Sequence, residues 1–171
     1  YKEIKERIPR EEIKDFKERF ANTFEKIAPP GSSFDIVGSF RRGAANSGDI
    51  DIIITNKDNN KKAFDDVLDS LIKDGMILEV LSRGKTKSLT IANIKPEGIA
   101  RRIDFLYTPP EEYAFAVLYF TGSKIFNTVM RQRALDMGYS LNEHGLYLMN
   151  KGVKGNKLDK ERLEQVIERY N

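Results

Sequence analysis

Two carboxylates at the head of an apolar segment constrain this chain more than any other feature. Asp49 and Asp51 flank Ile50, and the apolar run continues to Thr55. Because side chains alternate between the two faces of a strand, we expect both carboxylates to point the same way and Ile50 to face the core. Two aligned carboxylates repel each other, and a magnesium ion relieves that repulsion without an all-protein cage. The pair therefore predicts a metal site beside a buried strand.

A glycine-serine turn with basic residues comes shortly before this pair, in the segment Gly38-Ser39-Phe40-Arg41-Arg42-Gly43. Ser39 and the backbone of Gly38 could hold phosphate oxygens, and Arg42 could neutralise them through two parallel hydrogen bonds. The turn alone is also typical of an ordinary strand-to-helix connection with solvated arginines. Its short distance from the two carboxylates favours a phosphate site, and magnesium beside phosphate-binding groups suits transfer of a nucleotidyl group.

A third carboxylate, Asp104, lies in the expected strand Arg102-Ile103-Asp104-Phe105. Two-metal phosphoryl transfer uses carboxylates on neighbouring strands to hold metal ions roughly 3.5–4 Å apart. Asp104 could complete such a set, and it could also accept the proton of an attacking hydroxyl. Alone, it would be read as a charge at the end of a strand; beside Asp49 and Asp51, we favour the catalytic interpretation.

Composition excludes several other kinds of site. The chain has 171 residues, no cysteine and one histidine, so disulfides, thiolate metal sites and multi-histidine zinc sites are ruled out. The net charge is only +3, and the sequence contains no tail of clustered Lys and Arg. No apolar run is long enough to span a membrane, and no signal peptide is visible, although the chain begins with Tyr1. We expect an intracellular monomer, in the nucleus or cytoplasm or of viral origin, with no membrane partner.

Hydrophobic periodicity predicts an α+β fold with a mixed sheet and flanking helices. The expected elements are helix 10–27, strands 34–37 and 50–55, helix 63–73, strands 76–81, 88–94 and 103–107, helices 111–120 and 124–137, strands 139–141 and 146–149, and a helix that Asp159 caps and that ends near residue 170. Pro109-Pro110 marks the best boundary. We therefore expect a catalytic unit over 1–108 and a smaller, mostly helical lobe over 109–171.

The C-terminal lobe carries a second group of candidate residues around Tyr119-Phe120-Thr121-Gly122-Ser123. Gly122 permits a turn that other residues resist. The two rings could lie against a sugar and a base, although a core position is favoured for each ring taken alone. Asn127 and Arg131 are four residues apart on the next helix and share a face, so they could read a base edge and meet a template strand, or form a solvated polar face.

A basic hairpin offers a further candidate surface. Arg83, Lys85 and Lys87 alternate around Gly84, so we expect them to share one face and to reach a nucleic-acid backbone, although such runs are more often soluble edges. His144 is interpreted as a polar surface residue without a catalytic role.

Taken together, these blocks resemble the family X DNA polymerases, in the pattern of the beta type. The resemblance runs from Arg7 to Glu143, over most of the chain. It rests on separated motifs: Arg7-Ile8-Pro9-Arg10-Glu11-Glu12, Gly38 to Asp51, Arg101-Arg102-Ile103-Asp104, Leu118 to Ser123, Ile125-Phe126-Asn127, Met130-Arg131 and Leu141-Asn142-Glu143. It implies a nucleotidyltransferase palm followed by a nucleotide-selection lobe.

The resemblance also implies residue roles. Asp49, Asp51 and Asp104 would hold two magnesium ions, for which manganese can substitute, and Asp104 would activate the primer 3′-hydroxyl. The implied contacts to the incoming nucleotide are Gly38, Ser39, Arg42, Gly48 and Arg7 at the triphosphate, Tyr119, Phe120 and Gly122 beside the deoxyribose, and Asn127 at the base. Arg102 and Lys87 would contact DNA, and Arg131 would check the template side.

The chain departs from the family pattern at three positions. Lys124 replaces an aspartate and Thr128 replaces a lysine beside the nascent base pair, while His144 replaces an aromatic residue. The lyase and helix-hairpin-helix domains of the family lie outside this sequence, so we expect a minimal form and claim no excision chemistry.

The leading expectation is a template-directed DNA polymerase that uses dNTPs to fill short gaps during DNA repair, acting on gapped or primer-template DNA. A template-independent polymerase of the terminal-transferase type would share every catalytic residue. A small-substrate nucleotidyltransferase would share the turn and the paired acids but not the Tyr119 to Arg131 block. A DNA-binding scaffold with weak turnover stays open as a non-enzyme alternative.

Overall fold

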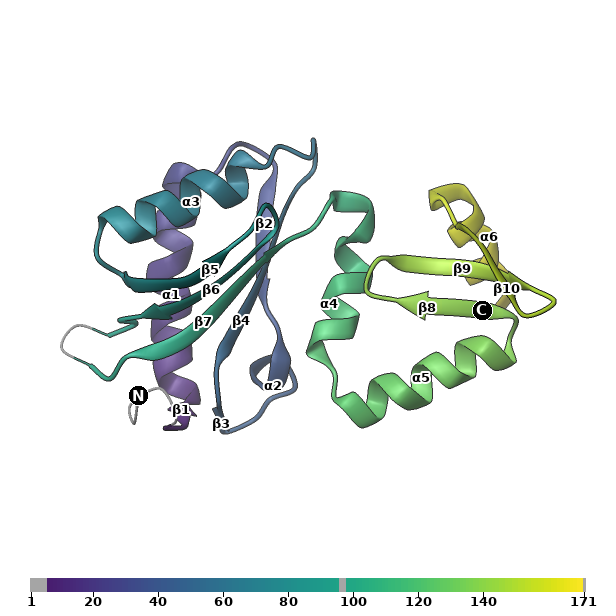
Figure 1. The fold of residues 1–171 in the computed structure, drawn as a ribbon, viewed down its shortest axis with the longest axis horizontal. Coiled ribbons are helices and arrows are strands. Elements are labelled where there is room, and N and C mark those ends of the chain that lie inside the picture. Colours follow the sequence, from purple (N-terminus) through teal and green to yellow (C-terminus); the bar gives the residue numbers. More distant parts are fainter. Residues whose placement is uncertain (1–5, 96–97, 171) are drawn as a thin grey trace. The chain divides into compact units, whose positions relative to one another are not determined.

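The structure, a computed structural model, describes residues 6–95 and 98–170. The chain forms two compact units, one reaching Pro110 and the other beginning at Glu111, and we describe each by itself (Figure 1). Within the described ranges, no helix combines the length and the apolar content that crossing a membrane requires.

A five-stranded mixed sheet forms the centre of the N-terminal unit. In spatial order its strands are β2 (Ser32–Ile36), β4 (Ile50–Asn56), β7 (Arg101–Tyr107), β6 (Lys87–Ala92) and β5 (Ile77–Arg83). The β4 and β7 strands are parallel, and the other neighbours are antiparallel. The register of the parallel pair aligns Asp51 with Asp104. The predicted strands are therefore present, and the pairing brings two of the predicted carboxylates to adjacent positions.

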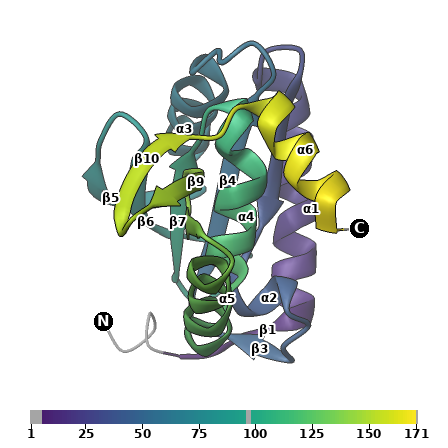
Figure 2. The same ribbon diagram turned by 90° about the vertical axis from the view of Figure 1, so that its right-hand side faces the viewer.

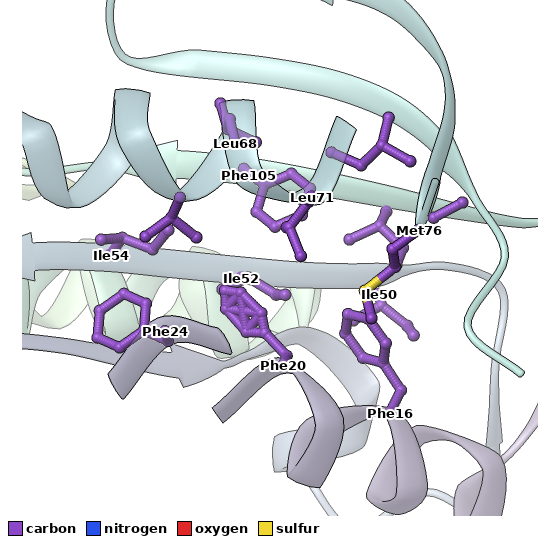
Figure 3. Packing of buried hydrophobic residues seen from close by; sticks show 14 of the residues in the cluster. Phe16, Phe20, Phe24, Ile50, Ile52, Ile54, Leu68, Leu71, Met76 and Phe105 are labelled. Atoms are coloured by element: carbon purple, nitrogen blue, oxygen red, sulfur yellow. The ribbon is translucent and has the colours of Figure 1, made fainter. Parts of the chain in front are cut away.

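Helices α1 (Arg10–Ile27) and α3 (Lys62–Lys73) pack against one face of this sheet (Figure 1). Phenylalanines at four-residue spacing along α1 enter the core, as Phe16, Phe20 and Phe24 show in Figure 3. The Phe20 ring lies against the rings of Phe34 and Phe105. Ile50, Ile52 and Ile54 of β4 join the same cluster. Burial of these side chains supplies the main driving force for the unit and leaves the opposite face of β4 and β7 for the carboxylates.

Three short elements of the N-terminal unit were not expected from the sequence. Helix α2 (Gly38–Arg41) follows β2, and two-residue strands β1 (Ile8–Pro9) and β3 (Asn46–Ser47) pair with each other. Figure 2 shows α2, β1 and β3 together at the end of the unit where α1 begins. Their pairing brings the start of the described chain against the segment that follows the glycine-serine turn, some forty residues later in the sequence.

The C-terminal unit combines helices with a small antiparallel sheet. A 3-10 turn, η2 (Pro110–Glu112), precedes the unit's other elements, which are α4 (Tyr113–Thr121), α5 (Lys124–Asp136), β8 (Tyr139–Asn142), β9 (Gly145–Asn150), β10 (Val153–Lys157) and α6 (Lys160–Tyr170). Strand β10 was missed because its residues show no apolar alternation. Asp159 caps α6 as predicted, since its Oδ1 accepts a hydrogen bond from the Arg162 amide. The α+β class is confirmed.

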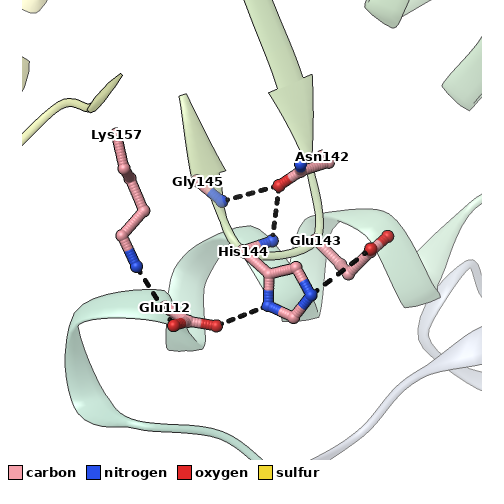
Figure 4. A network of polar contacts seen from close by, with 6 residues as sticks. All are labelled: Glu112, Asn142, Glu143, His144, Gly145 and Lys157. Carbon is pink, nitrogen blue, oxygen red and sulfur yellow. Dashed lines mark hydrogen bonds and ion pairs between the residues drawn. The ribbon is translucent and has the colours of Figure 1, made fainter. Parts of the chain in front are cut away.

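A polar network links the start of α4 to the sheet of this unit (Figure 4). Glu112 Oε1 lies 2.6 Å from His144 Nδ1, and Glu112 Oε2 accepts a hydrogen bond of 3.1 Å from Lys157 Nζ. Burial raises the pKa of Glu112, but the hydrogen bonds to His144 and Lys157 outweigh it, so the pKa lies below its ordinary value. His144 is 57% exposed, which agrees with the surface position expected for it.

Candidate active site

The three predicted carboxylates meet at one end of the parallel strand pair. Asp51 belongs to β4 and Asp104 to β7, whereas Asp49 comes just before β4 begins at Ile50. One carboxylate oxygen from each residue lies within 4.8 Å of those of the other two. The sequence placed Asp49 on the strand; in the structure it precedes the strand and still reaches the same site.

The three carboxylates of this cluster repel one another electrostatically. Burial, reinforced by the charges of Asp49 and Asp104, raises the pKa of Asp51 from 3.8 to about 7. Burial and the charge of Asp104 also raise the pKa of Asp49, against the lowering effect of Arg102 and Arg7. Three converging carboxylates offer the hard oxygen ligands that divalent cations such as magnesium prefer. The donor set therefore fits a divalent metal ion, whose charge would offset the repulsion.

Arg102 holds the carboxylate of Asp104. Its Nη2 donates a hydrogen bond of 2.7 Å to Asp104 Oδ1, and the two side chains are 28% and 21% exposed. The two residues lie on the same face of β7 because they are two positions apart. Arg102 Nε is buried and has no hydrogen-bond partner among the described residues. The pair orients one oxygen of Asp104 while both side chains keep contact with solvent.

The glycine-serine turn lies directly beside the acids. Gly38 has φ +66°, a backbone conformation that favours glycine, and a Cβ at this position would stand only 3.3 Å from Asp51 Oδ2. Ser39 Oγ donates a hydrogen bond of 2.6 Å to the buried Ser47 Oγ. Arg42 follows α2 and is exposed. The predicted turn and the predicted carboxylates are thus brought together.

The start of the described chain contributes two arginines to the same place. Arg7 Nε donates a hydrogen bond of 2.8 Å to Asn46 Oδ1, and a Cβ on Gly48 would lie 3.1 Å from Arg7 Nη1. Arg10 Nη1 donates to the carbonyls of Phe40 and Ala44, at 2.7 and 3.2 Å. Arg10 therefore clamps the turn that contains Ser39 and Arg42.

Sequence reasoning assigned no role to Arg10, because its contacts lie 30 and 34 residues away. Its guanidinium also lies 4.3 Å from the centre of the Phe40 ring. The only sequence signal was its place within the Arg7 to Glu12 motif, which identifies the segment but not its contacts.

The basic hairpin does not present its charges on one face, so that prediction is wrong. Arg83 pairs with Ser88 across the hairpin, which places Lys87 on the opposite face from Arg83. Arg83 faces α3, where its Nη1 donates to Asp69 at 2.7 Å and its Nη2 lies 3.8 Å from Asp65. Alternation along one strand does not continue around a turn. Lys87 lies on the carboxylate side and lowers the pKa of Asp51, whereas Arg83 stabilises the contact with α3.

In the C-terminal unit, the predicted residues gather around Tyr119. Asn127 Nδ2 donates a hydrogen bond of 2.8 Å to the Tyr119 carbonyl, and the Arg131 guanidinium lies 5.8 Å from the Tyr119 ring. Gly122, with φ +67°, turns the chain between α4 and α5. Phe120 packs edge-on against Tyr119 and is 36% exposed, so the core interpretation is wrong for this ring. Asn127 Oδ1 is buried without a hydrogen-bond partner in the described part of the chain.

Comparison with known proteins gives matches over both units. Residues 7–110 match the family model described as DNA polymerase beta palm, and residues 116–168 match the one described as DNA polymerase beta thumb. A DNA polymerase lambda of Rattus norvegicus is 36% identical over 154 residues, which cover 85% of this chain and 27% of the relative. A DNA polymerase lambda of Arabidopsis thaliana is 28% identical over 169 residues, which cover 92% of this chain and 32% of the relative. The chain thus spans less than a third of the length of either relative.

Proposed function

Because the chain belongs to the family X DNA polymerases, we propose that it is a template-directed DNA polymerase that fills short gaps in DNA repair. The observation that carries the proposal is the convergence of Asp49, Asp51 and Asp104 beside the Gly38–Arg42 turn. Converging acids next to donors suited to phosphate are the arrangement that nucleotidyl transfer requires.

In the proposed reaction, the primer 3′-hydroxyl attacks the α-phosphorus of a dNTP and pyrophosphate leaves. Asp104 accepts the hydroxyl proton, while Arg102 holds one of its oxygens in place. Two bound magnesium ions would neutralise charge on the triphosphate and lower the pKa of the attacking hydroxyl. Ser39, Arg42 and Arg7 bind the triphosphate, and Gly38 and Gly48 let the backbone approach it closely.

Nucleotide selection is assigned to the C-terminal unit. The residues proposed to meet the sugar, base and template are Tyr119, Phe120, Gly122, Asn127 and Arg131. The unpartnered Oδ1 of Asn127 supports a role in binding, since a buried acceptor without a partner is costly unless a ligand supplies a donor.

Lys87 and Arg102 are proposed to contact the DNA backbone. The protein is proposed to act inside the cell as a monomer.

Primer extension on a duplex with a one-nucleotide gap tests this function. Each dNTP is supplied singly with magnesium, and the wild type is compared with Asp104→Asn and with Asp66→Asn, a control for loss of one exposed carboxylate on α3. We expect incorporation of the complementary base alone, a rate lowered by roughly 100-fold or more in Asp104→Asn, and no change in Asp66→Asn.

Three results would overturn the proposal. Incorporation that ignores the template would assign the chain to template-independent addition. Near-normal turnover by a folded Asp104→Asn variant would remove Asp104 from the chemistry, and binding of the duplex without any incorporation would indicate a scaffold.

A further inference from the structure

A buried ion pair joins the start of α1 to strand β7, outside the cluster of catalytic carboxylates. Arg101 Nη2 and Nε donate to Glu12 Oε2 at 2.6 and 3.1 Å. The two side chains are only 5% and 13% exposed. Removing a pair of charges from water is costly, so such a pair calls for a structural or functional reason.

The same guanidinium also holds the beginning of the described chain. Arg101 Nη1 donates to the carbonyl oxygens of Arg7 and Glu6, at 3.2 and 3.4 Å. A guanidinium presents five N–H donors in one rigid plane, so it can grip a carboxylate with one edge and backbone carbonyls with the other. Glu12 neutralises and orients Arg101, and Arg101 in turn fixes the two peptide groups on either side of the Arg7 α-carbon.

The side chain of Ile8 anchors this segment in the core, where it is fully buried, but the backbone ladder beside it is short. Strand β1 has two residues, which pair with Ser47 and Asn46, and its second residue, Pro9, has no amide hydrogen to donate. The Arg7 side chain extends from this short ladder to Asn46 and to the vicinity of Gly48 and Asp49. The position of the Arg7 guanidinium therefore depends on how firmly its own backbone is fixed.

Arg101 is turned away from the site itself. Ile103 and Phe105 of β7 are buried in the core, and Arg101 shares their face, whereas Arg102 and Asp104 occupy the opposite face. An effect of Arg101 on nucleotide binding must consequently pass through the segment that it holds.

We propose that Arg101, held by Glu12, is a positioning residue that fixes the backbone of Arg7 so that the Arg7 guanidinium meets the triphosphate of an incoming nucleotide. The inference rests on the proposed function, because it needs a nucleotide at this site. Loss of the grip should weaken nucleotide binding and leave the chemical step of bound nucleotide largely unchanged. The arrangement differs from direct binding in that Arg101 touches no substrate.

A double-mutant cycle tests this coupling. The dissociation constant of the complementary dNTP is measured with magnesium and a gapped duplex whose primer ends in a dideoxynucleotide, so that binding is read without turnover. The variants are Arg101→Lys, Arg7→Ala and the two combined. We expect each single change to weaken binding roughly 10-fold, as for loss of a charged hydrogen bond, and the double change to weaken it no further. Additive effects of roughly 100-fold in the double variant would overturn the proposal.

Two further measurements separate positioning from general damage. Hydrogen exchange of residues 6–10 should accelerate in Arg101→Lys, and kcat on an extendable primer should change far less than KM. Arg19→Lys is the matched control, because Arg19 of α1 also donates to a backbone carbonyl, that of Ile94, away from the site. Unchanged exchange in Arg101→Lys would overturn the proposal. Should Arg101→Lys fail to fold, Glu12→Gln replaces it in every arm.

The outcomes also separate this proposal from the proposed function. A wild-type protein that binds dNTP but incorporates none would refute the polymerase, while the binding cycle would still decide the role of Arg101. A wild-type protein that binds no nucleotide at all would refute both.

Discussion

Replacing Asp51 with asparagine should stabilise the metal-free protein at and above neutral pH. Burial, with the charges of Asp49 and Asp104, raises the pKa of Asp51 from 3.8 to about 7. The folded state thus binds this proton more tightly than the unfolded state, so the free energy of unfolding falls as pH rises between these two values. A shift of roughly three pKa units corresponds to about 4 kcal/mol, which is a large fraction of the stability of a typical domain.

Urea unfolding in the presence of a chelator measures this effect. We expect Asp51→Asn and the wild type to differ by less than about 1 kcal/mol near pH 4 and by about 4 kcal/mol near pH 8, with the variant more stable. Asp66→Asn, which removes an exposed carboxylate from α3, should show no such dependence. A difference between Asp51→Asn and the wild type that does not change with pH would refute the electrostatic argument.

Magnesium should then reduce or reverse this difference. A ligand that binds only the folded state stabilises it by RT ln(1 + [L]/Kd), and the variant has lost one of the three carboxylates. The same titration with the wild type would yield the affinity of the metal site without a nucleotide.

Two further predictions concern stability in each unit. Glu112→Gln should lower the free energy of unfolding of the C-terminal unit by roughly 1 kcal/mol near neutral pH. The pKa of Glu112 is lower in the folded state than its ordinary value of 4.5, so its ionised form stabilises the fold at pH values above 4.5, and this stabilisation is lost as the pH falls. Chemical unfolding should therefore show the wild type and variant converging in acid, and a constant gap would contradict the role of the His144 and Lys157 contacts. Phe20→Ala should destabilise the N-terminal unit by about 3–5 kcal/mol, since this ring is fully buried, whereas Ile27→Ala, at a position 40% exposed, should change little. Equal midpoints for these two variants in urea would contradict the packing described for α1.

Local patterns predicted much of the fold. The expected helix over 10–27 coincides with α1 because its phenylalanines recur on one face and Pro9 and Pro29 bound it. The strand that carries Asp51 was recognisable from its continuous apolar run. Short elements such as β1, β3 and β10 were missed, since two to five residues without apolar alternation carry no periodic signal.

Contacts between distant segments were beyond sequence reasoning. Arg10 and Arg101 each belong to a recognised motif, yet their partners lie 30 to 95 residues away and depend on how β1, α2 and β7 assemble. The hairpin shows the same limit, since only the register of β5 and β6 decides that Arg83 faces α3 while Lys87 faces the acids.

The chemistry of the site could be predicted from the sequence, because the identity and spacing of Asp49, Asp51 and Asp104 are local properties of two segments. Tertiary structure alone decided how these groups behave. The parallel register of β4 and β7 sets Asp51 opposite Asp104, and burial in that position raises the pKa of Asp51 to about 7. Desolvation and charge repulsion depend on distance in space, and only the folded chain brings two segments some fifty residues apart within a few ångströms of each other.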